Sequence, residues 1–199
     1  MSTTFAVILA GGGGTRLGDV RKADLRIGGV RLLGRVAGIL NGQVDEVLIS
    51  SGSFGDLDLP GTTSISDQSD ERMGPLAGIR AAVAYLAHKA APEDVLISVA
   101  VDTPFLPAEY VGRLGEALSD DNAAYAAWGE NFYPTNAAWR LGMLRSALAE
   151  SMETLGPKAI LELMGAKRVD WSSVSAADPF ANLNTLVDLL ALQRRALGR

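Results

Sequence analysis

Residues 5–22 read FAVILAGGGGTRLGDVRK, and this stretch decides the fold class. Residues 5–10 form an unbroken apolar run rich in branched side chains, which is typical of a strand buried on both faces. The four glycines at residues 11–14 follow at once. Because glycine accepts positive φ and lets backbone N–H groups approach an anion closely, a glycine-rich turn after a strand predicts a phosphate-binding loop. Arg16, Arg21 and Lys22 then add positive charge.

Two familiar glycine motifs do not fit this loop. A P-loop requires Lys and a hydroxyl residue after its second glycine, but Asp and Val occupy residues 19–20. A dinucleotide fingerprint begun at Gly11 meets Arg16 where its third glycine belongs. The pattern LAGGxGxRLG with a lysine nearby instead resembles the opening motif of nucleotidyltransferases with a Rossmann-like fold. The plainer alternative is a glycine-rich turn with scattered surface cations.

Beyond the loop, apolar strands alternate with amphipathic helices, which predicts βαβ units and a mostly parallel sheet. Strands are expected at residues 46–50 and 95–101, and helices at residues 32–40, 74–86, 106–118 and 186–195. With the opening motif, this alternation implies an α/β fold, a Rossmann-like three-layer α/β/α nucleotidyltransferase. We expect one domain over residues 1–199. Its nucleotide-binding half would span about residues 1–105 and its acceptor-binding half about residues 106–199.

Composition narrows the class of protein. A length of 199 residues suits one domain with a full core, and the absence of cysteine excludes disulfides, thiolate metal sites and thiol nucleophiles. A net charge of −5 argues against binding of a nucleic acid. The N-terminal apolar run is too short to span a membrane and lacks the charged start of a signal peptide. We therefore expect a cytoplasmic protein that contacts neither nucleic acid nor membrane.

Asp102 follows directly after the apolar run at residues 95–101. In open α/β sheets, ligands bind outside the carboxyl ends of the strands. A carboxylate at such an end is costly to desolvate unless it meets a cation, and Mg²⁺ held by one carboxylate, substrate phosphates and water is a natural partner. The alternative is that Asp102 caps the following turn, with Thr103 and Pro104 as ordinary turn residues.

The motifs, taken together, resemble the molybdenum cofactor guanylyltransferases over nearly the whole chain. The matching segments, in chain order, are LAGGGGTRLG with Lys22, ISD at residues 65–67 with GPLAG at 74–78, VDTP at 101–104, YPT at 133–135, Gly156 with Lys158, and FANLNTL at 180–186. The last of these resembles a family FxNxNTP segment and carries Leu186 in place of the proline.

The resemblance implies roles for individual residues. The catalytic residues would be Arg16, Lys22 and Asp102, with Asp102 as the ligand of Mg²⁺, or of Mn²⁺ in its place. The nucleotide-binding positions would be Leu9, Ala10, Gly11, Gly12, Gly13, Lys22, Ser50, Asp67 and Asp102. The acceptor-binding positions would be Gly78, Lys158, Asn182 and Asn184.

The implied reaction is transfer of GMP from GTP to the terminal phosphate of molybdopterin or its molybdenum-loaded form, with release of pyrophosphate. Gly11 favours GTP, because related enzymes that use CTP resemble LAAG at this position, and a methyl group there would crowd a purine. Transient contacts with other cofactor-biosynthesis proteins and with molybdoenzyme chaperones are implied too. The alternatives are cytidylyl transfer to molybdopterin, a sugar-1-phosphate nucleotidylyltransferase, and a nonenzymatic adaptor that binds nucleotide or cofactor.

Overall fold

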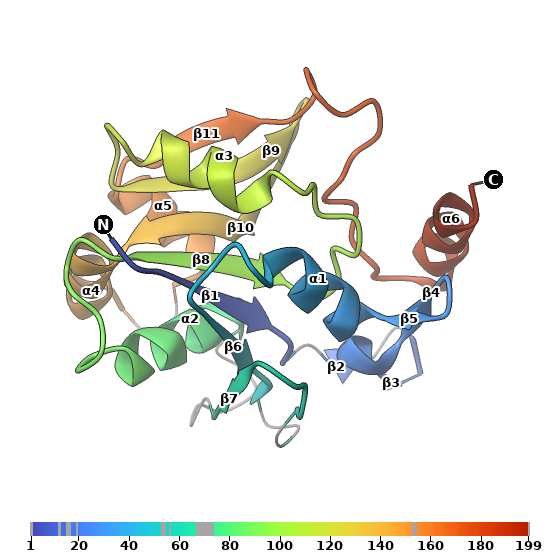
Figure 1. The fold of residues 1–199 in the computed structure, drawn as a ribbon. Coiled ribbons are helices and arrows are strands. Elements are labelled where there is room, and N and C mark those ends of the chain that lie inside the picture. The colour runs from blue at the N-terminus through green and yellow to red at the C-terminus, as the bar shows by residue number, and fades with distance from the viewer. Residues whose placement is uncertain are drawn as a thin grey trace.

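The computed structural model describes residues 2–11, 13–14, 17–18, 20–52, 55, 57–66, 74–152 and 155–198. Figure 1 labels its strands and helices. The strands are β1 (Thr4–Leu9), β2 (Gly13–Gly14), β3 (Val20–Arg21), β4 (Arg26–Ile27), β5 (Val30–Arg31), β6 (Glu46–Ser50), β7 (Thr63–Ile65), β8 (Val95–Ala100), β9 (Ala123–Trp128), β10 (Asn131–Arg140) and β11 (Lys167–Asp170). The helices are α1 (Leu32–Leu40), α2 (Gly74–Tyr85), α3 (Tyr110–Ala117), α4 (Leu141–Glu150), α5 (Pro157–Leu163) and α6 (Leu186–Ala196), and Lys22–Asp24 forms a short 3-10 turn.

A seven-stranded sheet in the order β11-β9-β10-β8-β1-β6-β7 forms the centre of the molecule. β1 pairs in parallel with β6 and β8, β6 pairs in parallel with β7, and β11 pairs in parallel with β9. β10 runs antiparallel to both of its neighbours. The mostly parallel sheet predicted from the sequence is therefore confirmed, with one reversed strand inside it.

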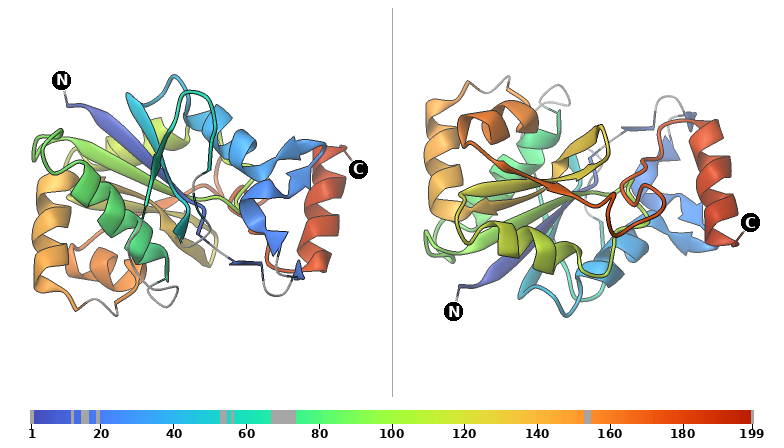
Figure 2. Two further views of the ribbon diagram at one scale, coloured as in Figure 1. Left: turned by 90° about the horizontal axis from the view of Figure 1, so that it is seen from below. Right: turned by 90° about the horizontal axis from the view of Figure 1, so that it is seen from above.

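Helices cover both faces of this sheet, as the two views of Figure 2 show. α1 and α3 pack on one face, and α2, α4 and α5 pack on the other. Strand β1 shows why both faces of the sheet are shielded from water. Ala6 and Ile8 pack in the hydrophobic core on one face, and Phe5, Val7 and Leu9 pack in the core on the other. An unbroken apolar strand needs a cover on each side, so the opening sequence requires this three-layer arrangement.

The reversed strand β10 departs from regular pairing near the middle of the sheet. Its register with β9 shifts between Tyr133 and Ala137, and Pro134 within this interval has no N–H to donate to the ladder. Asn136 is fully buried there, and its Oδ1 accepts a hydrogen bond from the Ala100 N–H at 2.9 Å. The side chain thus replaces a ladder partner at the end of β8 and lets the first residues of β10 turn away from that strand.

The C-terminal helix α6 lies at one side of the sheet, where it packs on the β4–β5 hairpin (Figure 1). The Gln193 side chain accepts a hydrogen bond from Gly28 N at 2.8 Å and donates one to Arg26 O at 3.0 Å. Only a narrow stripe of the helix is covered. Leu192 is buried, but Leu186 and Leu190 are 62% and 60% exposed. The helix expected at residues 186–195 is therefore present, and it contacts the rest of the chain mainly through Leu189 and Leu192.

The helix expected at residues 106–118 begins later, at Tyr110. Leu106 precedes a proline, which disfavours the helical conformation, and the first turn-closing bond runs from Tyr110 N to Pro107 O at 3.1 Å. The elements from β9 to β11 were not predicted from periodicity. None of the helices in the described ranges combines the length and apolar character that a bilayer crossing requires.

Candidate active site

The carboxyl ends of β1, β6 and β8 meet at one edge of the sheet. Ala10 N donates to Ser50 O at 2.7 Å, and Val101 N donates to Leu9 O at 3.2 Å. Leu9, Ala10 and Ser50, which the sequence assigns to the nucleotide, are thus brought together by backbone hydrogen bonds. Parallel strands place their following loops at a common edge, so the glycine loop and Asp102 emerge next to each other.

The loop after β1 approaches the loop after β6 very closely. A Cβ added to Gly11 would lie 3.1 Å from both the Cα and the N of Gly52, which itself has φ +60°. Any side chain at residue 11 would push against the backbone of the neighbouring loop. The contact gives a structural reason for glycine here, besides the room for a purine predicted from the sequence.

Lys22 links three segments that are far apart in the sequence. Its Nζ donates to Asp102 Oδ2 at 2.7 Å and to Asn184 Oδ1 at 2.7 Å. The side chains of Lys22 and Asp102 are only 13% and 15% exposed. The pair is therefore shielded from water on most sides, where charge interactions are stronger than at a free surface.

The segment that carries Asn184 is anchored next to the end of β8. Leu183 N donates to Asp102 O at 3.0 Å. Asp188 Oδ2 accepts from Asn184 N at 3.0 Å and from Thr185 N at 2.8 Å, and Thr185 Oγ1 in turn accepts from Asp188 N, which completes a capping box at the start of α6. Burial opposes ionisation of Asp188, but these hydrogen bonds and the charge of Lys22 outweigh it and lower its pKa.

The other end of the same segment is held by β10. Tyr133 donates its phenolic proton to Asp178 Oδ2, and Asp178 Oδ1 accepts from Phe180 N at 2.9 Å. Burial, together with the hydrogen bond to Asp178 and the charge of that carboxylate, raises the pKa of the Tyr133 phenol. The rings of Tyr133 and Phe180 lie 5.2 Å apart, and Phe180 is fully buried. Residues 178–185 thus have a fixed path across the edge of the sheet.

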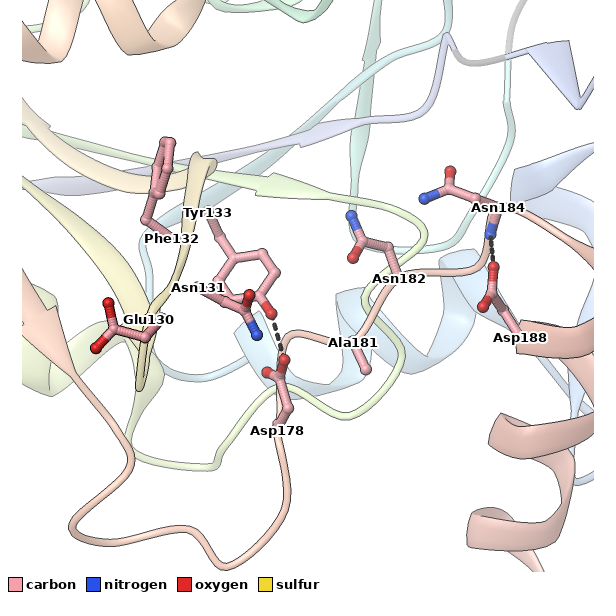
Figure 3. A pocket seen from close by; sticks show the side chains of 9 residues that line it. All are labelled: Glu130, Asn131, Phe132, Tyr133, Asp178, Ala181, Asn182, Asn184 and Asp188. Carbon is pink, nitrogen blue, oxygen red and sulfur yellow. Dashed lines mark hydrogen bonds between the residues drawn. The ribbon is translucent and has the colours of Figure 1, made fainter.

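A pocket of about 480 Å³ runs along this path (Figure 3). Asn184 and Asp188 line one end of it, beside Lys22, and Glu130 and Phe132 line the other. Asn131, Tyr133, Asp178, Ala181 and Asn182 complete the lining. In Figure 3, Asn182 and Asn184 extend to the same side of the segment that carries them. The pocket therefore connects the charged Lys22 cluster with the tip of the β9–β10 hairpin, and its walls are rich in amides and carboxylates.

Comparison with known proteins decides which family this site belongs to. A MobA-like NTP transferase domain matches residues 6–191. The chain belongs to the MobA-like NTP transferase family. It is 33% identical over 199 residues to a protein of Nitrobacter hamburgensis named molybdenum cofactor guanylyltransferase, and the match covers 97% of this chain and 94% of that protein. A protein of the same name from Rhodobacter capsulatus is 38% identical over 195 residues, with 95% and 94% covered.

Solved structures share the MobA-like fold. Molybdopterin-guanine dinucleotide biosynthesis protein A from Archaeoglobus fulgidus gives a TM-score of 0.71 at 20% identity, covering 99% of this chain and 100% of that one. The 2-C-methyl-D-erythritol 4-phosphate cytidylyltransferase of Thermus thermophilus gives 0.70 at 20% identity, with the same coverage. These likenesses establish the fold, and the sequence relatives establish the family. The fold class and the family resemblance predicted from the sequence are both confirmed, and the chain carries a nucleotidyltransferase domain.

In this MobA-like chain, the predicted acceptor residues do not lie in one place. Asn182 and Asn184 line the pocket next to Lys22. Lys158 lines a second pocket of about 270 Å³ instead, together with Tyr125, Phe132 and Pro134. Gly78 lies in the buried part of α2, where an added Cβ would be 2.7 Å from both Leu9 Cδ2 and Ser50 Oγ. The structure thus gives Gly78 a packing role at the sheet edge.

Other predicted residues are placed as follows. Gly13 pairs with Arg21 in the β2–β3 ribbon, and Arg21 Nη2 donates to Gly55 O at 2.8 Å, which ties the glycine loop to the loop after β6. Gly12, Arg16 and Asp67 lie outside the described residues. Their predicted roles in nucleotide binding and catalysis therefore stay predictions.

Two of the site residues that the sequence analysis missed, Asp178 and Asp188, hold the segment that carries Asn182 and Asn184. Asp188 could have been found, because Thr185 and Asp188 have the spacing of a capping box just before an apolar run. Asp178 offered no such signal, since its partner Tyr133 lies 45 residues away. Only the fold brings these two side chains together.

Proposed function

We propose that this protein transfers GMP from GTP to the terminal phosphate of molybdopterin, or of its molybdenum-loaded form, and releases pyrophosphate. The observation that carries the proposal is the meeting of Lys22, Asp102 and Asn184 through two hydrogen bonds of 2.7 Å at the end of a pocket. Relatives named molybdenum cofactor guanylyltransferase, 33% and 38% identical over almost the whole chain, support the same reaction.

The chemistry requires little acid–base assistance from the protein. An oxygen of the acceptor phosphate attacks the α-phosphorus of GTP, the bond from this phosphorus to the α–β bridging oxygen breaks, and that oxygen leaves on pyrophosphate. Because the acceptor phosphate is already anionic near neutral pH, no strong general base is needed. Catalysis then depends on positioning the two phosphates and on neutralising their charge. We assign to Lys22 and Arg16 the neutralisation of charge at the α-phosphate and at the leaving group.

The side-chain oxygen atoms next to Lys22 are suitable ligands for Mg²⁺, or for Mn²⁺ in its place. The carboxylate of Asp102 and the amide oxygen of Asn184 are hard oxygen ligands, and both accept a hydrogen bond from the ammonium group of Lys22. Within the described residues, no group of three or more His, Cys, Asp or Glu side chains could hold a metal alone. A Mg²⁺ ion bound by one carboxylate together with substrate phosphates does not require such a group. When bound, the ion would supply further neutralisation of phosphate charge, with Asp102 as its protein ligand.

The proposal divides the domain between its two substrates. We assign residues 1–105, with Leu9, Ala10, Gly11, Ser50 and the predicted Gly12 and Asp67, to GTP. We assign residues 106–199, with Asn182, Asn184 and Lys158, to molybdopterin. We further propose a cytoplasmic enzyme that contacts cofactor-biosynthesis proteins and molybdoenzyme chaperones transiently, since its product must reach a recipient protein.

The decisive experiment measures pyrophosphate release with each nucleoside triphosphate in the presence of molybdopterin, of a sugar 1-phosphate, or of no acceptor. We expect release only with molybdopterin and a divalent cation present, and a preference for GTP over CTP of at least about tenfold in kcat/KM, or roughly 1.4 kcal/mol. A preference for CTP would show that the protein transfers CMP and not GMP. Activity only with a sugar 1-phosphate would show that the acceptor is a sugar phosphate and not molybdopterin. No release under any condition would favour a nonenzymatic binding protein. Gly11→Ala is a poor test of base choice, because the added methyl would collide with Gly52.

A further inference from the structure

The side chain of Phe132 stands out among the exposed apolar residues of the protein. The exposed large hydrophobic residues in the described ranges are Val20, Val30, Phe132, Met143, Met152, Leu163, Val174, Leu186, Val187, Leu190 and Leu197. Phe132 is the only aromatic residue among them, and it is 46% exposed. Single aliphatic side chains at a surface need no explanation, but a large aromatic ring in water forgoes much of the burial that stabilises folding.

Phe132 is also the only residue that lines both pockets described above. It ends the 480 Å³ pocket that begins at Asn184, and it forms one wall of the 270 Å³ pocket that contains Lys158. The residue therefore lies at the boundary between the two groups of predicted acceptor residues. Any acceptor that begins at Lys22 and extends along the first pocket arrives at this ring.

The ring is held in a fixed orientation although it is exposed. Tyr125 meets it edge-on, with ring centroids 6.4 Å apart and an interplanar angle of 76°. Lys158 Nζ lies 5.2 Å from its centroid, a distance typical of a cation–π contact. Phe132 is also part of β10, where it pairs with Ala127 just after the turn. A rigid aromatic ring on a strand loses little conformational entropy when a ligand stacks on it.

Residues with hydrogen-bonding side chains line the first pocket together with Phe132. Glu130, Asn131 and Asn182 line the pocket. Asp178 and Asp188, in contrast, are occupied by Phe180, Tyr133, Asn184 and Thr185. Two amides and one carboxylate can satisfy both the N–H donors and the oxygen and nitrogen acceptors at the edge of a pterin.

We infer that Phe132 is the residue on which the pterin ring of the acceptor stacks, while the terminal phosphate of the same molecule lies at Lys22. This inference rests on the proposed function. Molybdopterin carries its phosphate and its pterin ring at opposite ends. One end of the pocket is lined by Asn184, which accepts a hydrogen bond from Lys22, and the other end is lined by the aromatic ring of Phe132. Lys158, which the sequence assigns to the acceptor, then acts at the ring end through its contact with Phe132.

The test compares Phe132→Ala and Phe132→Leu with Phe132→Tyr. For each, the KM values for molybdopterin and GTP are measured anaerobically, and the Kd of molybdopterin without GTP is measured by isothermal titration calorimetry. Stacking of a heteroaromatic ring on an aromatic side chain is worth enough that Phe132→Ala should weaken molybdopterin about tenfold or more in KM and Kd. Phe132→Leu keeps the apolar bulk and should lose most of the same affinity, whereas Phe132→Tyr should retain it. The KM for GTP should stay within about twofold of the wild type.

Met143→Ala is the matched control, because Met143 is 44% exposed on α4 and lines neither pocket. It should change neither KM. If Phe132→Ala and Phe132→Leu bind molybdopterin as the wild type does, the stacking assignment is overturned while the proposed reaction stands. If both KM values and the Tm move together, the ring has a structural role and the inference also fails. If the wild-type protein binds no molybdopterin, the proposed function itself is wrong.

Discussion

The two sides of the site are built in different ways. On the nucleotide side, the carboxyl ends of buried parallel strands place Leu9, Ala10 and Ser50 through backbone hydrogen bonds. On the acceptor side, side chains hold residues 178–185 in place, through the Tyr133–Asp178 hydrogen bond at one end and the Thr185–Asp188 capping box at the other. Lys22 joins the two sides, since it donates to Asp102 and to Asn184.

This contrast predicts how each side responds to substitution. Backbone geometry at the end of a central strand survives the loss of a single side chain, so variants on the nucleotide side should keep the fold and lose chemistry. The acceptor side depends on a few polar contacts, each of modest net energy. Variants there should shift the affinity for one substrate while chemistry at Lys22 and Asp102 continues.

The largest effect is expected for Asp102→Asn. The substitution keeps the shape of the side chain but removes the charge that pairs with Lys22 and that would bind Mg²⁺. Turnover should fall on the order of 10²-fold or more, measured as pyrophosphate release at saturating Mg²⁺. Circular dichroism should remain that of the wild type, because Asp102 follows β8 and is not part of the core.

A matched control exists at the far edge of the sheet. Asp121 also pairs with a lysine, Lys167, at 3.6 Å. Asp121→Asn makes the same chemical change outside the site and should leave turnover unaltered. If Asp102→Asn keeps near wild-type turnover, Asp102 is not a catalytic residue and serves only as a structural partner of Lys22.

A smaller effect, confined to one substrate, is expected for Tyr133→Phe. The variant loses the hydrogen bond to Asp178 and loosens one end of the segment that carries Asn182 and Asn184. A net loss of about 1 kcal/mol corresponds to a rise of roughly fivefold in the KM for molybdopterin. The KM for GTP should not change, so steady-state kinetics with each substrate varied in turn provides the measurement.

Tyr85→Phe is the control for this variant. Tyr85 also donates to a carboxylate, Glu46 Oε1 at 2.9 Å, and lines neither pocket. It should leave both KM values unchanged. Equal rises in both KM values for Tyr133→Phe would contradict the division of the site into two independently held sides.

The same contrast explains what the sequence could predict. The opening strand and the strand before Asp102 are local apolar patterns, and their parallel pairing puts Gly11 and Asp102 just beyond the carboxyl ends of neighbouring strands, as expected. The acceptor side was predicted only in part. Asn182 and Asn184 could be named by resemblance, but Asp178 and the two separate pockets depend on β10, whose irregular pairing around Pro134 and Asn136 arises from contacts 36 to 45 residues apart. Gly78 is buried against Leu9 and Ser50, a contact that no local pattern reveals.

The smallest effect concerns Leu186, where the family segment resembled by FANLNTL carries proline. Leu186 is the first residue of α6, its side chain is 62% exposed, and the N-cap residue Thr185 before it is extended, with φ −135° and ψ 167°. Proline is well accommodated at the first helical position, and an extended residue is what it requires before it. The capping box uses the N–H of Asp188, so proline at residue 186 removes none of its bonds. Leu186→Pro should therefore raise stability by about 0.5–1 kcal/mol, or about 1–4 °C in Tm, by restricting the unfolded chain, with unchanged kinetics.

Leu190→Pro, at a similarly exposed position inside the helix, should instead lower stability by about 3 kcal/mol. If both variants lower the Tm by the same amount in thermal denaturation, residue 186 is not the first residue of α6 in solution.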